Sequence, residues 1–100
     1  MSHHCHALNC ETNVPPRMHM CGRHWRMVPR RLQDALWANY RRGQERTLTP
    51  SAAYLRAAAD CVRAVAEKEG QPPDEIEWEV GLYITWAENL EAEAEEVHDA

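Results

Sequence analysis

The chain has 100 residues, a net charge of −5 and a hydrophobic content of 44%, yet fourteen residues are alanine and none is phenylalanine. Burial alone stabilises a single domain of this length and composition only marginally, so a bound metal or a partner chain would add stability that the core lacks. No stretch approaches about 18 uncharged apolar residues, and the first residues lack the basic start and apolar run of a secretory signal. These features argue against a membrane protein, and we expect a cytoplasmic one.

Charge is divided unevenly between the two halves of the chain. Residues 1–46 carry eight arginines and three acidic residues, a net charge of +5. Residues 47–100 carry three basic and thirteen acidic residues, a net charge of −10. An anionic partner for the first half is one explanation, and attraction between the two halves, within the fold or between chains, is the other.

Cysteine and histidine are concentrated in the first quarter of the chain, which holds three of the four cysteines and five of the six histidines. Because cytoplasmic thiols stay reduced, such clusters bind a metal more often than they form disulfides. Zinc takes four tetrahedral ligands from thiolate and imidazole, and structural zinc sites fill all four positions with protein side chains. The spacing C-x4-C-x10-C-x2-H predicts a zinc set of Cys5, Cys10, Cys21 and His24.

The segment between the two ligand pairs supports this set. Residues 13–16, NVPP, are typical of a turn, and residues 17–20 can return as a short extended segment that brings the second pair back to the first. Cys21 and His24 are three residues apart, which places both side chains on one face of the first turn of a helix. A knuckle, a returning loop and a ligand pair that opens a helix are typical of a treble-clef or zinc-ribbon-like arrangement.

Neighbouring side chains leave alternatives open. His4 or His6 could replace the first cysteine as a ligand, and His19 could compete with the last histidine. Catalytic zinc keeps an open position for water. With four good ligands and Glu11 as the only nearby carboxylate, the sequence favours a closed structural site over an enzyme. Three thiolates around zinc leave one net negative charge, and the arginines near enough in sequence to offset it are Arg17, Arg23 and Arg26.

A first helix is predicted over residues 30–42, with Pro29 in its first turn and Gly43 at its end. Trp25 precedes it, as a lid over the metal site or as a stacking surface. Basic side chains interleaved with tryptophan can contact the phosphates of nucleic acid. The alternative is a solvated face whose last arginines favour the helix dipole. The predicted nucleic-acid or partner surface comprises Arg23, Arg26, Arg30, Arg31, Arg41, Arg42 and Trp37.

A connector over residues 43–48 leads to a second helix, with Thr49 as its N-cap, Pro50 in its first position and Gly70 as its stop. The inner stripe of this helix is mostly small, which lets another helix approach closely. Cys61 is expected to be a small core residue rather than a ligand. The stripe consists of Leu55, Ala58, Ala59, Val62, Val65 and Ala66.

The last helix is predicted over residues 74–97, after a Pro-Pro turn and two acidic residues that favour a helix N-terminus. It has two apolar faces, which is more than one small partner helix can cover. One face carries Ile76, Val80, Tyr83, Ile84, Ala87, Leu90, Ala94 and Val97. The second stripe, Trp78, Leu82 and Trp86, is either core beneath the first helix and the zinc segment, or an interface with another chain.

The run VPPRMHMCGRHWRMVPRRLQDALWANYRRGQ, preceded by the CHALNC pair, resembles small uncharacterised zinc-binding proteins of bacteriophages and prophages that share a C...C...VPP...MC..HW..VP..L...W..YR.GQ pattern. In those proteins an alanine-rich helix similar to PSAAYLRAAADCVRAVAEKEG follows. The likeness covers residues 5–70. It implies a phage source, the cytoplasm of a host cell, and a zinc ion bound through Cys5, Cys10, Cys21 and His24. It implies no activity, and it says least about the acidic last helix.

Together these patterns predict a mostly α protein in which a zinc knuckle is continuous with a helix and packs on a long antiparallel helical pair. Residues 1–28 would form the knuckle and residues 29–100 a three-helix body, within one compact domain. The leading function hypothesis is a non-enzymatic module that presents a basic Arg/Trp surface to nucleic acid or to an acidic host protein. The alternative is an interaction factor or inhibitor of host or bacterial-defence machinery that uses the acidic last helix or the Trp78, Leu82 and Trp86 stripe. A homodimer is a further possibility.

Overall fold

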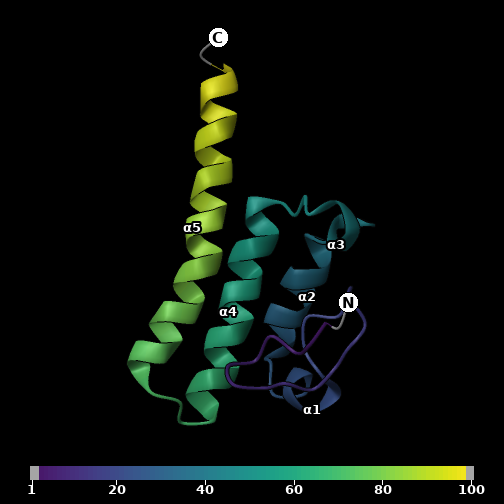
Figure 1. The fold of residues 1–100 in the computed structure, drawn as a ribbon, viewed down its shortest axis with the longest axis vertical. Coiled ribbons are helices and arrows are strands. Elements are labelled where there is room, and N and C mark those ends of the chain that lie inside the picture. The colour runs from purple at the N-terminus through teal and green to yellow at the C-terminus, as the bar shows by residue number, and fades with distance from the viewer. Residues whose placement is uncertain (1–2, 99–100) are drawn as a thin grey trace.

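The computed structural model describes the backbone of residues 3–98 and the side chains of residues 3–95. Within this range the chain is mostly helical, as predicted, and its helices are α1 (Gly22–Trp25), α2 (Arg30–Ala38), α3 (Gln44–Thr47), α4 (Ala52–Lys68) and α5 (Pro73–His98). Extended pairing among these residues is limited to one isolated antiparallel bridge between His4 and Asn13. Figure 1 shows α4 in the middle, with α5 along one side and α1 to α3 and the N-terminal segment on the other.

Helix α4 supplies the centre of the core. Its predicted inner stripe is buried in full, and Cys61 is buried with it, as expected from the sequence. The helix begins later than predicted, because Ser51, not Thr49, is the N-cap: the Ser51 hydroxyl accepts a hydrogen bond from the Tyr54 backbone N–H at 3.1 Å. Thr49 instead lies 2.6 Å from Thr47 through their hydroxyl oxygens. Serine, like threonine, caps a helix by giving a free N–H an acceptor, so the cap chemistry is unchanged.

Helix α5 lies beside α4, and the chain reverses between them through Gly70, whose φ of 70° suits a residue without a side chain (Figure 1). Alanines of α4 allow a close approach, and Ile76, Val80 and Ala87 of α5 are buried. The C-terminal half of α5 projects beyond α4 in Figure 1, and the side chains of residues 91–95 are exposed. Ala94 of the predicted inner face is therefore uncovered, and the Val97 side chain falls outside the described ones.

Helix α2 is shorter than predicted, and this moves part of the predicted basic surface. The helix ends at Ala38, where the Asn39 side-chain amide donates to the Ala35 carbonyl at 2.8 Å and competes with a further helical turn. Gly43 adopts a left-handed φ of 86° and precedes α3 instead of ending α2. Arg41 and Arg42 therefore lie in the turn between α2 and α3.

The predicted connector over residues 43–48 contains the short helix α3, so that prediction was wrong. Hydrogen bonds from polar side chains stabilise this turn, and the composition of the segment does not predict them. The Gln44 side chain is buried, and its carbonyl oxygen accepts the Arg41 backbone N–H at 2.8 Å. The Tyr40 hydroxyl donates to the Glu45 carboxylate, with distances of 3.0 and 2.8 Å to its two oxygens.

The segment before α1 is a loop held by backbone hydrogen bonds and by its own buried side chains. The Cys5 N–H donates to the Thr12 carbonyl at 2.8 Å, and the His6 N–H donates to the His19 carbonyl at 2.9 Å. Met20 is buried in the same core as α4. Residues 17–20 return toward the start of the chain as predicted, but by turns and bends and not as an extended segment. None of the helices in the described part of the chain is long and apolar enough to span a membrane.

Candidate metal centre

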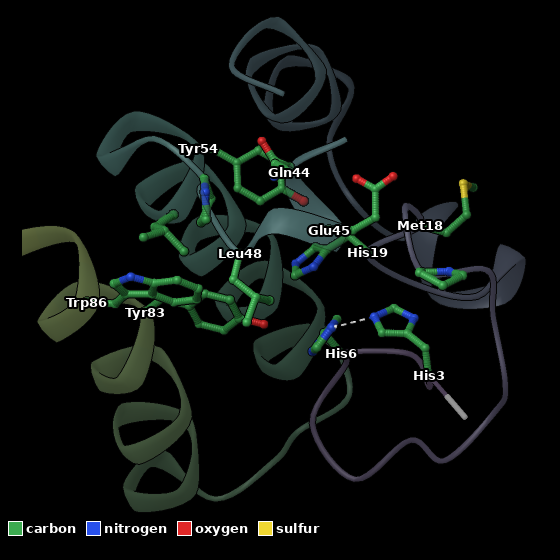
Figure 2. Close-up of a pocket in the computed structure, with 13 residues that line it drawn as sticks. His3, His6, Met18, His19, Gln44, Glu45, Leu48, Tyr54, Tyr83 and Trp86 are labelled. Atoms are coloured by element: carbon green, nitrogen blue, oxygen red, sulfur yellow. Dashed lines mark hydrogen bonds between the residues drawn. The ribbon is translucent and has the colours of Figure 1, made fainter. Parts of the chain in front are cut away.

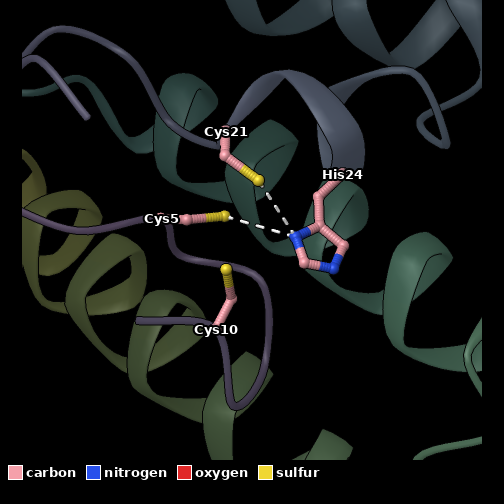
Figure 3. A group of neighbouring side chains, drawn as sticks. All are labelled: Cys5, Cys10, Cys21 and His24. Atoms are coloured by element: carbon pink, nitrogen blue, oxygen red, sulfur yellow. Dashed lines mark hydrogen bonds between the residues drawn. The ribbon is translucent and has the colours of Figure 1, made fainter. Parts of the chain in front are cut away.

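The structure brings Cys5, Cys10, Cys21 and His24 together, with one ligand atom from each lying within 4.8 Å of all the others. Figure 3 shows the three sulfur atoms and the His24 imidazole converging on one point. The His24 Nδ1 atom is 3.3 Å from Cys21 Sγ and 3.7 Å from Cys5 Sγ. Tetrahedral zinc places its sulfur and nitrogen ligands about 3.5 to 3.8 Å apart, so the cluster has nearly the size that the ion requires. All four cysteines of the chain are free thiols.

Local turns aim these four side chains inward. Asn9 adopts a left-handed φ of 66°, a conformation that asparagine tolerates, and this reverses the chain between Cys5 and Cys10. Cys21 is extended and stands as the N-cap of α1. The Trp25 N–H donates to the Cys21 carbonyl at 2.8 Å and closes the first helical turn, so Cys21 and His24 share a face as their spacing predicted.

Burial and hydrogen bonds shift the pKa values of the three thiols in different directions. Cys5 is 1% exposed, and burial raises the pKa of its thiol to about 11. Burial also acts to raise the pKa of Cys10, but hydrogen bonds from Thr12 outweigh it and lower that pKa to about 7. Burial opposes ionisation of Cys21 as well, yet the backbone N–H and imidazole of His24 lower its pKa. Two of the three thiols are thus prepared to ionise, which a divalent cation requires of its sulfur ligands.

Glu69 completes the site from outside the cluster. The His24 Nε2–H donates to the Glu69 carboxylate at 3.1 Å, which leaves the Nδ1 lone pair directed at the sulfur atoms. Arg23 lies 3.6 Å from the same carboxylate oxygen. A carboxylate on the outer nitrogen is the usual partner of a metal-bound histidine, because it fixes the tautomer and the ring orientation. The sequence analysis missed Glu69, since it lies 45 positions from His24 and no spacing rule joins the two.

The alternative ligands lie elsewhere. His4 is exposed, and His6 contacts His3 with 3.1 Å between their Nε2 atoms. His19 is buried, and its Nε2–H donates to the Ala58 carbonyl at 3.3 Å. Burial lowers the pKa of His6 to about 4 and that of His19 to about 3. The described cluster therefore consists of the four residues that the spacing predicted.

The predicted basic surface divides into two groups. Four of its arginines, Arg23, Arg26, Arg30 and Arg31, are exposed, and two of these pair with a carboxylate: Arg23 with Glu69 at 3.6 Å and Arg30 with Asp34 at 3.2 Å. Arg42 and Trp37 instead line an open hollow of about 620 Å³, and Arg41 lies exposed beside it in the same turn. The hollow also contains Arg17, Arg46 and Tyr40.

Arg17 and Arg46 were not included in the predicted surface. Arg17 was instead expected to offset charge near the metal, but it faces Tyr40 and Glu45. The position of Arg17 depends on how the N-terminal loop packs against α3, and no local sequence pattern predicts that packing.

The predicted second interface is largely uncovered. Trp78 is 72% exposed, Leu82 53% and Trp86 40%, so the interpretation of this stripe as core is wrong for Trp78 and Leu82. Trp86 differs from the other two because it lines a pocket formed with the N-terminal loop and α3.

Comparisons of this chain with protein-family models, with curated proteins and with solved structures find no match.

Proposed function

We propose that Cys5, Cys10, Cys21 and His24 hold a structural zinc ion. Three thiolates and one imidazole are a preferred zinc donor set, and four protein ligands complete a tetrahedron without leaving a position for water. The inward convergence of the four side chains and the Glu69 contact to His24 support this assignment. We further propose that residues 1–28, of which the structure describes 3–28, form a treble-clef or zinc-ribbon-like zinc knuckle that rests on the antiparallel pair α4 and α5. The proposed zinc agrees with what the phage-protein resemblance implies, and a phage source stays part of the proposal.

The function that the surface supports best is a non-enzymatic module that binds nucleic acid, with the zinc fixing the loop that carries Arg17. One observation carries this proposal: Arg17, Arg42 and Arg46 line a single hollow together with Trp37 and Tyr40. Arginine binds phosphate through several N–H donors, and aromatic rings stack on bases. The arginines and the two aromatic rings together match both parts of a nucleotide, its phosphate and its base.

Salt dependence tests the proposal directly. A labelled single strand of DNA or RNA should bind the zinc-loaded protein, and its affinity should fall steeply between about 50 and 200 mM salt. Arg42→Ala should weaken binding and reduce the slope of log K against log salt by about 1. The matched control is Arg56→Ala, which removes an exposed arginine of the acidic half that pairs with Glu91 at 2.6 Å and should leave binding unchanged. Absence of binding at about 50 mM salt, or a flat salt response, would overturn the proposal.

A second candidate function rests on the exposure of Trp78 and Leu82. Large apolar side chains exposed together on a helix with many carboxylates favour a protein partner with a basic, partly apolar surface. In this case the protein acts as an interaction factor or inhibitor, and nucleic acid does not bind. Trp78→Ala would then abolish capture of the partner while Arg42→Ala would not.

A further inference from the structure

A second hollow lies on the other side of Met18 and Glu45 from the arginine hollow. It is a partly open pocket of about 290 Å³, close to the lower end of the roughly 300–1,000 Å³ range of small-molecule sites. Figure 2 shows that its walls come from four separate segments: the N-terminal loop, α3 with the turn after it, α4 and α5. Both hollows include Met18 and Glu45 in their lining, so they adjoin at these two side chains.

The pocket has an aromatic side and a polar side. Tyr54, Tyr83 and Trp86 supply aromatic rings, and Tyr83 lies edge-on to the rings of His6 and His19, with centroids 6.4 and 5.9 Å away. Imidazoles of the N-terminal loop form the opposite side in Figure 2. A flat ring that enters between these walls can stack on an aromatic face and reach polar atoms with its edge.

The hydrogen bonds around the imidazoles indicate which of their nitrogens donate and which accept. His3 Nδ1–H donates to the Val14 carbonyl at 3.3 Å, so the neutral ring accepts at Nε2 from His6 Nε2–H at 3.1 Å. His6 then keeps an acceptor at Nδ1. His19 donates its Nε2–H to Ala58 and likewise keeps an acceptor at Nδ1. The Glu45 carboxylate already accepts from the Tyr40 hydroxyl and has further acceptor capacity, so a flat ring that carries N–H groups could pair with it and with the imidazoles.

We propose that this pocket holds one base of a single-stranded nucleic acid, of the kind that carries an exocyclic amino group, while its phosphates lie against Arg17, Arg42 and Arg46. This inference rests on the proposed nucleic-acid binding and names the unit that is recognised. A base enters such a pocket only when it is unpaired, because pairing in a duplex hides both its faces and its edge. The Glu45 carboxylate at the boundary repels phosphate and so keeps the strand's backbone on the arginine side.

Two tryptophans of α5 provide a matched test. Trp86 lines the pocket, whereas Trp78 lies two turns earlier on the same helix and is fully outside it. Binding of a labelled deoxyadenosine strand to the zinc-loaded protein is measured for the wild type, Trp86→Ala and Trp78→Ala. The Trp86→Ala variant should bind the strand about tenfold more weakly than the wild type, because it loses one base–aromatic stack. The Trp78→Ala variant should bind like the wild type.

An abasic strand of the same length separates the pocket from the phosphate contacts. It should bind more weakly than the deoxyadenosine strand and should not distinguish Trp86→Ala from the wild type. If Trp86→Ala binds the deoxyadenosine strand normally while Arg42→Ala weakens it, the pocket inference is overturned and the nucleic-acid proposal stands. If no strand binds, both are overturned.

Discussion

The N-terminal segment, residues 3–28, and the helical pair α4–α5 reach a fixed structure by different means. The first has one four-residue helix and one isolated bridge among its described residues, and it is held by loop hydrogen bonds around four side chains that converge on one point. The second is two long helices joined by a buried stripe of alanine and valine. If the proposed zinc is bound, the comparison implies that stability depends on the metal in the first region and on burial in the second.

The largest expected effect comes from removing the metal. Structural zinc supplies on the order of 10 kcal/mol of folding free energy in small domains, so chelation or Cys21→Ser should unfold the segment before α2. Helices α4 and α5 should stay helical, because they pack chiefly on each other. Metal analysis, far-UV circular dichroism and hydrogen exchange resolved by segment would measure this. Cys61→Ala is the matched control, since it removes a buried thiol outside the cluster and should keep the zinc.

Two results would contradict the claim that the N-terminal segment depends on zinc. One is native protein without bound zinc, and the other is a Cys21→Ser variant with normal protection from hydrogen exchange over residues 3–28. Loss of all helicity on chelation would contradict the claim that α4 and α5 are stable without the metal, because it would mean that the two regions fold as one unit.

The sequence predicted the parts of each region that local rules control. Metal sites need fixed residue types at short spacings, so the cluster of Cys5, Cys10, Cys21 and His24 could be predicted without a structure. The buried stripe of α4 repeats with the helical period, so its residues could be named as well. The end of α2 could not, since Asn39 and the buried Gln44 rearrange the chain through side-chain hydrogen bonds that no periodicity reports.

Long-range contacts could not be predicted from the sequence either. Glu69 contacts His24, and Arg17 lines the same hollow as Arg42 and Arg46, only because the loop folds back onto segments far along the chain. These contacts depend on the path of the backbone through space, which spacing along the sequence does not encode.

A smaller effect is expected in the burial-dependent region. Ile76 of α5 is 5% exposed, and Ile76→Ala should lower the free energy of unfolding by about 2–5 kcal/mol through lost apolar burial and a cavity. Leu82→Ala, on the same helix but 53% exposed, should change it little. Urea denaturation of the zinc-loaded proteins measures both, with metal content unchanged in each. Equal destabilisation by the two variants would show that the Leu82 face is covered in solution, as the protein-partner or homodimer interpretation requires.

The smallest effect is expected where the two regions meet, at Glu69 beyond the end of α4. Glu69→Ala removes the acceptor for His24 Nε2–H and frees the imidazole to rotate away from the sulfur atoms, so zinc affinity should fall about 10- to 100-fold. Glu67→Ala removes a carboxylate two positions away that does not contact the cluster, and it should bind zinc like the wild type. Competition with a chromophoric chelator measures both affinities. Because Glu69 belongs to the helical region and His24 to the metal region, a reduced affinity for Glu69→Ala alone would show that α4 sets the quality of the site. Equal zinc affinities of the Glu69→Ala and Glu67→Ala variants would mean that the N-terminal segment binds its metal without help from the helices.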